Sequence, residues 1–516
     1  MKFSLGLTAV TICAVAGIYI GGCGAPSGHG IGVLDPYETG TPYVPGGGTS
    51  TPKPTSSPSP ASGVFQSGLS DPVGFMRQGN YYWTLQVDRT SNQDGYLVAI
   101  AVDTEKGKSD SDKDSPHRMK LVDKSGKEVK LSKPTGFTYL KQNYDEQTGT
   151  WALYHNDKSK IYSAESGYFI ICDNFDKPNN GRIIIVNADI DGEGGTIEED
   201  ELYCHVIYEN AKYPLKVAAN AKYIFWTEYA QDGDVRRLQW NEHPEDGPKN
   251  YDLRYFVQSM NFPTNINLDG GNLCVADTGK NQVLVAPPEL EHEQKSESAV
   301  IKDYQTDKDN NVFVLGDDKL TQPYDMKWTE DNRLLIIDGS GWPFYSEVSG
   351  TTPRGSGAGN LKIWDVDPDP QTSTQKDTSR IYTLVKGLTN PTSLEIMYDS
   401  TLDTSSTYRQ LVDVLITEYQ ESSNQSDLRS CRCYIPYKNV SDTPKFSKVF
   451  VEGVNKCTES HLLPDTAITS PNEKGELVVP REKGDDKYFT VFYNENFGAT
   501  YSGNSTWWRY YEKYPH

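Results

Sequence analysis

The sequence of 516 residues predicts an all-β fold built from a repeated unit, and three observations carry that prediction. First, a β-branched or aromatic run leads seven times into a proline or its replacement, at spacings of 49–80 residues. Second, an apolar run that ends on a carboxylate follows most of these prolines. Third, a polar turn and another apolar run follow each carboxylate. A recurrence on this scale is typical of a repeat architecture.

Each repeated unit has the pattern of four short strands. The first strand follows the proline, and the second ends on the acid. The third strand follows the turn, and the fourth leads to the next proline. The proline positions are Pro72, Pro134, Pro214, Pro263, Pro323, Pro391 and, as a replacement, Cys457. The recurring acids are Asp173, Glu228, Asp277, Asp338 and Glu418. The first copy, at 80–85, fits the pattern but lacks the acid. Four short strands per unit, separated by turn signals, predict a β-propeller.

The two ends of the repeat region predict how the ring closes. The strand at 64–68 has no inner strands of its own before it, and the last unit supplies apolar strands at 488–493 and 506–511 but no fourth. The N-terminal strand would complete that last blade and so remove free sheet edges. Seven four-stranded blades are favoured, with six blades plus a C-terminal extension as the alternative. The segments 102–120, 135–166 and 339–359 are expected to be loop inserts on the propeller faces, where binding function concentrates.

One stretch resembles a known repeat. Residues 263–285 (PTNINLDGGNLCVADTGKNQVLV) resemble an NHL repeat, and residues 213–240 and 322–341 resemble it more distantly. The resemblance implies a propeller. Some six-bladed relatives are lactonases that bind a metal through acidic and amide side chains on their inner strands. Asn265, Asp325 and Thr392 occupy comparable positions after the prolines, but they do not reproduce that pattern.

The N-terminus has the features of an export signal that ends in a lipid anchor. Residues 1–22 contain Lys2, an apolar stretch from 5 to 20, and small residues before Cys23. The four residues ending in Cys23 resemble the bacterial lipobox, with Ile20 in place of the usual leucine. We therefore expect a signal peptide at 1–22 and lipidation of Cys23 by fatty acids such as palmitate. Because Gly24 rather than aspartate follows, the resemblance implies the outer membrane. An ordinary signal peptide with an incidental cysteine is the alternative.

Composition divides and limits the rest of the chain. Residues 23–63 are rich in Gly, Pro, Ser and Thr and are expected to form a disordered tether, whereas residues 64–516 form the propeller domain. The net charge of −21 argues against nucleic acid as a partner. The 33 Tyr and nine Trp suit exposed β-structure, and equally the recognition of a glycan or a protein.

One acidic segment has the spacing of a calcium loop. In residues 187–198 the side chains of Asn187, Asp189, Asp191, Glu193 and Glu198 are candidate calcium ligands, and Gly192 permits a sharp turn. A solvated acidic loop is the competing interpretation, because the first position is Asn and no flanking helix is predicted. Residues 307–311 form a weaker candidate.

Catalytic candidates are sparse. The recurring acids either form a ring around the channel or accept hydrogen bonds from turn N–H groups, and their recurrence favours the structural role. No nucleophile elbow occurs. Among the eight His, only His155, His205 and His461 lie inside predicted blades, and His461 is a candidate for the channel mouth.

The cysteines beyond the signal give no zinc-site spacing. Cys431 and Cys433 lie two apart in a predicted strand and therefore share a face, where they are poorly placed to bond each other. Cys457 is the most plausible partner for one of them.

The leading functional hypothesis is a membrane-anchored exported lipoprotein whose propeller binds a protein or glycan partner without catalysis. The second is an exported hydrolase or lactonase that acts at the central funnel. The third is a structural component of an envelope assembly. The fold alone does not choose between them.

Overall fold

The computed structural model of the chain describes the repeat region in segments. Residues 1–65, with the expected signal peptide, Cys23 and the tether, lie outside the described residues. Within the described segments, no helix has the length and apolarity needed to span a membrane. The described residues are 66–69, 72–78, 81–87, 95–103, 108–109, 117–145, 150–154, 167–173, 179–188, 201–220, 222–239, 253–269, 272–290, 300–301, 307, 310–316, 319–329, 333–339, 359–365, 381–401, 408–420, 425–436, 445–455, 461–464, 475–483, 486–493 and 511–512.

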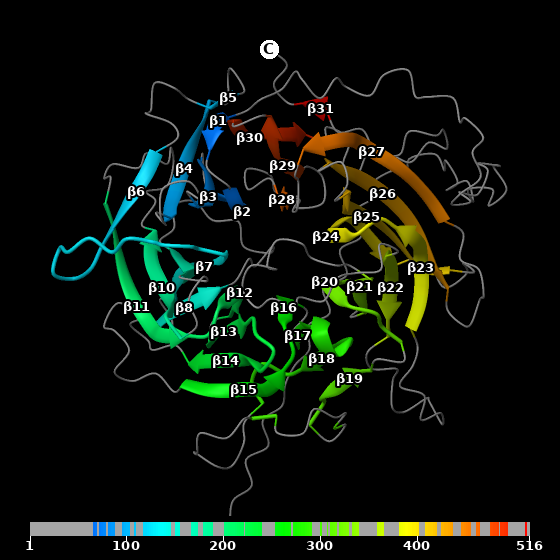
Figure 1. Cartoon of the computed structure of the whole chain (residues 1–516), viewed down its shortest axis with the longest axis horizontal. Coiled ribbons are helices and arrows are strands. Elements are labelled where there is room, and N and C mark those ends of the chain that lie inside the picture. Colours follow the sequence, from blue (N-terminus) through cyan, green and yellow to red (C-terminus); the bar gives the residue numbers. More distant parts are fainter. Residues whose placement is uncertain are drawn as a thin grey trace, which may run out of the picture.

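The described strands form seven blades arranged around a central axis (Figure 1). In every blade neighbouring strands are antiparallel. The strands of each blade are given below from the innermost, next to the axis, to the outermost. Blade 1 contains β2 (Pro72–Gln78), β3 (Tyr81–Val87), β4 (Gly95–Asp103) and β6 (His117–Val122). Blade 2 contains β7 (Gly136–Asp145), β9 (Gly167–Asp173), β10 (Gly181–Ala188) and β11 (Glu201–Ala211). Blade 3 contains β12 (Pro214–Ala219), β13 (Tyr223–Glu228), β14 (Gly233–Gln239) and β15 (Leu253–Met260).

The remaining blades repeat this order. Blade 4 contains β16 (Pro263–Asp269), β17 (Asn272–Asp277), β18 (Gln282–Ala286) and β19 (Phe313–Leu315). Blade 5 contains β20 (Pro323–Trp328), β21 (Leu334–Asp338), β22 (Gly359–Trp364) and β23 (Ile381–Leu388). Blade 6 contains β24 (Pro391–Thr401), β25 (Tyr408–Gln420), β26 (Gln425–Pro436) and β27 (Lys445–Asn455). Blade 7 contains β28 (His461–Pro464), β29 (Gly475–Lys483), β30 (Asp486–Tyr493) and β1 (Gln66–Leu69).

The structure confirms the seven-bladed propeller and its closure. β1 comes from the start of the repeat region and pairs antiparallel with β30 near the C-terminus, with Gln66 opposite Phe489 and Leu69 opposite Lys487. The edge of β30 is therefore covered by a strand from the other end of the domain, which removes a free pairing edge from the last blade.

Blade 7 differs from the prediction in the strand that fills its second place. The segment 506–511 was expected as a blade strand, but its described end belongs to β31 (Tyr511–Glu512), which pairs with β30 beside the main order. β29, which was not predicted, is the second strand of the blade, between β28 and β30. Its pattern VVPREK breaks into charged residues after two valines, so the apolar signal is short.

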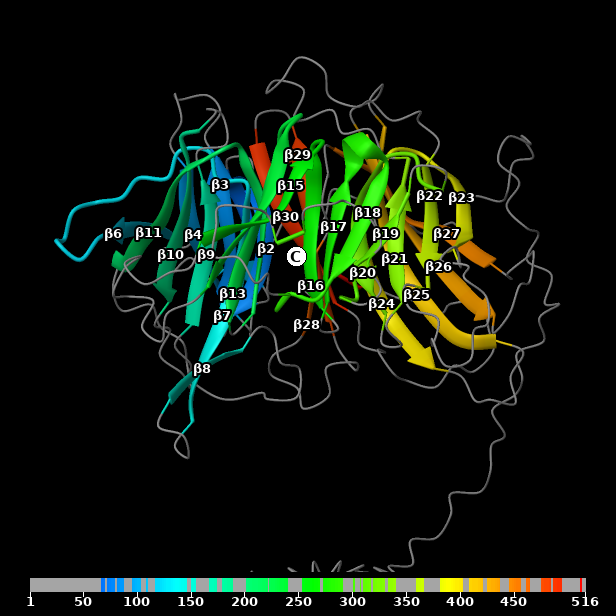
Figure 2. The ribbon, with the colours of Figure 1, turned by 90° about the horizontal axis from the view of Figure 1, so that it is seen from below.

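The segment 135–166 was predicted to be a loop insert, but its described part is built of strands. Its first part is β7, the innermost strand of blade 2. β8 (Thr150–Tyr154) forms a hairpin with the second half of β7, from Lys141 to Asp145. In Figure 2 this hairpin projects from one face of the ring. Likewise, the segment 102–120 contains β5 (Lys108–Ser109), which pairs with β4, and the start of β6.

Blades 1 and 2 share a continuous sheet. The second half of β6 leaves β4 and pairs in parallel with β11, with Lys120 opposite Glu201 and Tyr203 opposite Val122. This contact joins the outermost strands of two neighbouring blades. Local sequence signals predict hairpins between consecutive strands. They cannot reveal this pairing, because the two strands are about eighty residues apart in the sequence.

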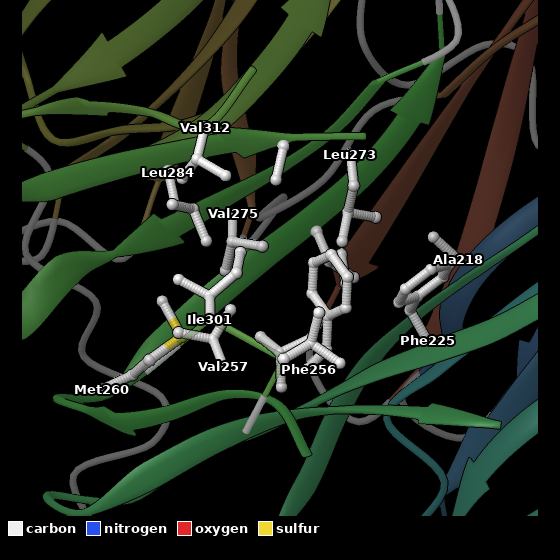
Figure 3. Packing of buried hydrophobic residues seen from close by; sticks show 14 of the residues in the cluster. Ala218, Phe225, Phe256, Val257, Met260, Leu273, Val275, Leu284, Ile301 and Val312 are labelled. Carbon is white, nitrogen blue, oxygen red and sulfur yellow. The ribbon is translucent and has the colours of Figure 1, made fainter. Parts of the chain in front are cut away.

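Apolar side chains between the blades hold the ring together. Figure 3 shows the cluster between blades 3 and 4, where Phe225 and Phe256 meet edge to face with ring centroids 5.2 Å apart. Val275 and Leu284 of blade 4 are fully buried against them. Burying side chains of this size stabilises a fold by roughly 1.5–3 kcal/mol each.

Candidate functional site

The recurring acids are placed by a repeated register. In blades 3 and 4 the strand-ending acid lies directly opposite the proline that starts the blade, as Glu228 opposite Pro214 and Asp277 opposite Pro263. Blade 1 follows the same register with Gln86 opposite Pro72, so a buried amide replaces the missing acid. The sequence pattern shows that the acid is missing from this blade but does not reveal the replacement.

Each acid accepts a hydrogen bond from the backbone N–H two residues before the proline. In blades 2, 4, 5 and 6 one carboxylate oxygen lies 2.6–2.8 Å from that nitrogen. In blade 3, Glu228 accepts the N–H of Lys212 in the same way. All five acids have at most 1% of their surface exposed. The donor–acceptor pairs are Ser132–Asp173, Asn261–Asp277, Thr321–Asp338 and Thr389–Glu418.

The turn that the acid holds is strained. The residue just before the proline has a positive φ in four blades, from 39° to 66°, although none of these residues is glycine. A conformation of this kind costs on the order of 1–3 kcal/mol and persists only where its surroundings enforce it. The carboxylate hydrogen bond supplies that enforcement. The four residues are Tyr213, Phe262, Gln322 and Asn390.

A cation from the third strand compensates four of the five buried acids. Lys362 Nζ lies 2.6 Å from Asp338 Oδ2, and Arg429 Nε lies 2.5 Å from Glu418 Oε2. Arg182 pairs with Asp173. Arg236 lies 3.6 Å from Glu228, where burial nevertheless raises the pKa of the carboxyl. These bonds bear out the structural role of the acids rather than a catalytic ring.

Asp277 of blade 4 differs from the other four acids. The third-strand position that carries the cation in blades 5 and 6 is occupied here by Leu284. Asp277 Oδ2 is buried and has no hydrogen-bond partner among the described residues; Asp338 Oδ2 also makes no hydrogen bond of ordinary geometry, but Lys362 Nζ lies 2.6 Å from it. Burial raises the pKa of this carboxyl to about 7, while the N–H of Asn261 and the charge of Lys280 oppose the shift.

The post-proline residues Asn265 and Asp325 lie together on neighbouring inner strands. Asn265 Nδ2 donates to Asp325 Oδ1 at 2.5 Å, and the same oxygen accepts the N–H of Met326 at 2.8 Å. Asp325 Oδ2 accepts the N–H of Leu394 at 2.8 Å. The carboxylate therefore connects blades 4, 5 and 6. Burial raises the pKa of Asp325, and the charge of Lys327 and these hydrogen bonds oppose the shift.

Thr392, the third post-proline candidate, does not join that cluster. Its hydroxyl donates to the carbonyl of Thr417 at 3.4 Å within blade 6. Other post-proline threonines make similar scaffold contacts, as Thr135 donates to the carbonyl of Pro214 in the next blade at 2.7 Å. Of the three candidates, only the amide and the carboxylate meet.

Further polar groups on the inner strands surround Asp325. Lys327, two residues along β20, lies 3.5 Å from Glu395 of β24. The charge of Lys216 in β12, two blades away, also opposes the rise in the pKa of Asp325. Asn267 donates to the carbonyl of Met326 at 3.1 Å. These contacts cross blade boundaries, and they hold the inner strands of blades 4 to 6 in register.

The proposed calcium ligands are almost wholly outside the described residues. Only the backbone of Asn187 is described, as part of β10, while Asp189, Asp191, Glu193 and Glu198 lie outside. In the weaker candidate, Asn310 Nδ2 donates to Asp307 Oδ2 at 2.8 Å, which closes a turn between two bridged residues. In the part of the chain that the structure describes, no three His, Cys, Asp or Glu side chains gather as a metal site.

The remaining candidates are scattered. His205 lies in β11 opposite Ile185, and His461 begins β28, the innermost strand of blade 7. His155 and Cys457 lie outside the described residues. Cys431 and Cys433 are both buried in the apolar cluster between blades 5 and 6, as expected for residues on one face.

A groove on the outer rim of blade 1 was not anticipated from the sequence. It has a volume of about 240 Å³ and lies between the start of β4, β6 and residues 128–131. The guanidinium of Arg118 stacks over the ring of Tyr96 at 4.4 Å from its centroid. Tyr203 on the adjoining strand β11 is 62% exposed. The sequence signal that was available is the density of Lys and Arg between 117 and 133.

Comparisons with known proteins add no family. No protein-family model matches the sequence, and no curated protein matches it. A putative 6-phosphogluconolactonase from Bacteroides fragilis is similar in structure, with 11% identity over 84% of this chain and 94% of that chain, at a TM-score of 0.43. A putative 6-phosphogluconolactonase from Bacteroides uniformis gives 9% identity over 80% and 95% and a TM-score of 0.37. The WD40 β-propeller domain of Doa1 gives 9% over 83% and 97%, with a TM-score of 0.35. At TM-scores below 0.5 these similarities carry no argument about activity or ligand.

Proposed function

We propose that the chain is a membrane-anchored exported lipoprotein whose propeller binds a protein or glycan partner and catalyses no reaction. The single observation that carries the non-catalytic part is the position of Asp325. Both of its carboxylate oxygens accept hydrogen bonds, from Asn265 Nδ2 and from the backbone of Met326 and Leu394. A carboxylate committed to three donors of its own scaffold is held as a structural acceptor.

The anchoring part of the proposal comes from the sequence. Cys23 follows an apolar signal, and a tether of Gly, Pro, Ser and Thr separates it from the first blade. Several acyl chains on one cysteine hold a protein stably on a membrane, because each buried methylene contributes about 0.8 kcal/mol. The resemblance to the lipobox and Gly24 favour the outer membrane.

Hydrolysis at the central funnel is the competing function. It is favoured by the polar inner strands, where Lys327 pairs with Glu395 and the pKa of Asp325 is raised by burial. A hydrolase needs one of these groups to act on a substrate, whereas the contacts described above use them between blades. A structural role in an envelope assembly is compatible with the same contacts. It differs from the proposed binding function only in the number of partners.

Anchoring and binding are tested separately. Labelled palmitate should be incorporated into the intact chain and not into a Cys23→Ala variant, whose signal should also remain uncleaved at that position. A pull-down from native envelope with the intact lipoprotein should recover a defined partner. The recovery should persist in an Asn265→Ala variant that folds normally. Turnover of lactone or ester substrates that is abolished in the same folded variant would overturn the non-catalytic proposal.

A further inference from the structure

A basic hairpin on an acidic protein is the strongest unexplained feature. The segment 117–133, here called the basic hairpin, contains six Lys or Arg and two Asp or Glu, a net charge of +4, whereas the whole chain carries −21. Five of the six cationic side chains are exposed: Arg118, Lys120, Lys124, Lys127 and Lys130.

The tip of the basic hairpin is a defined turn. Asp123 Oδ1 accepts the N–H groups of Ser125 and Lys127 at 2.8 and 3.0 Å, and Gly126 supplies the positive φ of 78°. The strands on either side remain paired, as the N–H of Val129 donates to the carbonyl of Leu121 at 2.8 Å. The lysines of the tip are thus carried on an ordered support rather than on a loose loop.

The basic hairpin stands away from the ring. Figures 1 and 2 show residues after β6 extending sideways beyond the outer strands of blades 1 and 2. At its base, Leu131 bridges Gly95, and β6 pairs with both β4 and β11. The basic hairpin therefore projects from the rim that the described strands of blades 1 and 2 form.

The groove at the base of the basic hairpin adds aromatic groups to the charge. Tyr96 lies under Arg118, and Tyr203 is 62% exposed on the adjoining strand. Tyr side chains are enriched where a protein meets the boundary between lipid and water, because the ring is apolar and the hydroxyl is wet. Cationic side chains beside them attract anionic headgroups within a Debye length of about 8 Å.

The place of the first described strand in the ring bears on which surface the basic hairpin faces. The first described strand, β1, is the outermost strand of blade 7, which adjoins blade 1 in the ring. The first described residue of the ring, Gln66, therefore lies in the blade next to the one that carries β6, from which the basic hairpin extends. The membrane as the partner of the basic hairpin rests on the anchoring proposed above, whereas the hairpin and its charges are features of the structure.

We propose that the basic hairpin, with Tyr96 and Tyr203, docks on anionic phospholipid headgroups and sets the orientation of the propeller on the membrane. The net charge of the whole chain is negative and is repelled by the same headgroups, so the basic hairpin is the part that faces the lipid. The partner-binding faces of the ring are then held roughly upright relative to the membrane plane.

The test uses the chain from residue 23 onward with Cys23→Ser, so that no acyl chain contributes. Its co-sedimentation is measured with vesicles of phosphatidylglycerol and phosphatidylethanolamine, and with neutral phosphatidylcholine vesicles. We expect binding to the anionic vesicles alone, weakened by added salt. A Lys124→Glu/Lys127→Glu variant should bind at least about tenfold more weakly.

A matched variant carries the same change of charge elsewhere. Lys222 and Lys386 are exposed in blades 3 and 5, so a Lys222→Glu/Lys386→Glu variant should bind as the parent does. Equal loss in both double variants, or no binding of the parent to anionic vesicles, overturns the docking proposal. Retention on an acidic polypeptide matrix without vesicle binding overturns it in favour of an acidic protein partner. If the Glu variant of the hairpin unfolds, Lys124→Gln/Lys127→Gln replaces it. Because Cys23 is absent throughout, none of these results bears on lipidation, which palmitate incorporation reports.

Discussion

Asn265 and Asp325 join two neighbouring blades through a 2.5 Å hydrogen bond from the amide Nδ2 to the carboxylate Oδ1. The residues are sixty positions apart and each lies two residues after the proline that starts its blade. The second carboxylate oxygen continues the contact to the backbone of Leu394 in the next blade. Three blades therefore depend on one buried side chain.

Replacing Asp325 should destabilise the propeller. An Asp325→Ala variant leaves the amide of Asn265 and the N–H groups of Met326 and Leu394 without their acceptor. Each buried donor left unsatisfied costs about 1–3 kcal/mol, so we expect a total loss of several kcal/mol. Thermal or urea unfolding of the purified domain measures it.

Asn267 provides the control for that experiment. Asn267→Ala removes one hydrogen bond to a backbone carbonyl in the same layer and should cost only about 1 kcal/mol. If Asp325→Ala were as stable as the parent, Asp325 would not be a structural acceptor, and its place at the axis would then argue for contact with a substrate.

The repeat was predictable because its signals are local. The proline positions, the strands that end on an acid and the closing strand can all be read from short apolar runs and turns. β8 and the parallel pairing of β6 with β11 could not be read in this way. Their partners are set by tertiary contacts, and the strand propensity of a segment does not specify which edge it joins.

Glycines at the start of third strands form a second layer of blade contacts. A Cβ atom at Gly181 would lie 2.3 Å from Cδ of Pro214, and one at Gly359 would lie 2.3 Å from Cδ of Pro391. Both neighbours are rigid rings of the next blade. We expect Gly181→Ala to cost several kcal/mol in unfolding free energy, because neither the ring nor the strand can move without disturbing the blade boundary.

Gly126 at the tip of the basic hairpin is the matched control. It has a positive φ and no atom within 4 Å of its virtual Cβ, so Gly126→Ala pays only for the backbone conformation, about 1 kcal/mol. Equal losses in the two variants, measured by urea unfolding, would mean that the contact with Pro214 does not limit the packing of blades 2 and 3.

Deleting the closing strand should open the ring. A chain that starts at residue 72 lacks β1 and exposes the edge of β30, whereas a chain that starts at residue 64 retains the pairing of Gln66 with Phe489. We expect the shorter chain to unfold at a lower temperature and to associate through the free edge, because an unpaired strand offers its N–H and C=O groups to other chains. Scanning calorimetry and light scattering compare the two. Identical melting and a monomeric state for both would show that the N-terminal strand is dispensable for closure.

The site could be predicted only in part, and the reason lies in the third strands. The structural role of the acids followed from their recurrence, since catalytic groups are normally singular. The cations that compensate Asp338 and Glu418 lie on the following strand after turns of different length, so no fixed spacing identifies them. For the same reason the sequence does not show that Asp277 lacks a compensating cation. This follows only from comparing the register of β17 and β18 with the registers of the other blades.

Asp277 should make the stability of blade 4 depend on pH. Burial raises the pKa of this carboxyl in the folded state from an ordinary value of 3.8 to about 7. Between these two values the folded chain binds more protons than the unfolded chain, so the contribution of this group to stability falls as the pH rises from about 4 to about 7 and stays low above that.

An Asp277→Asn variant retains an oxygen for the N–H of Asn261 and removes the charge. It should therefore be as stable as the parent near pH 4 and more stable, on the order of a few kcal/mol, at pH 8. Asp338→Asn is the control, because Lys362 compensates that carboxylate at 2.6 Å and its removal should bring no gain at pH 8. Urea unfolding of the three proteins across this pH range measures the difference, and an Asp277→Asn variant that shows the same stability difference from the parent at every pH would contradict the titration of Asp277.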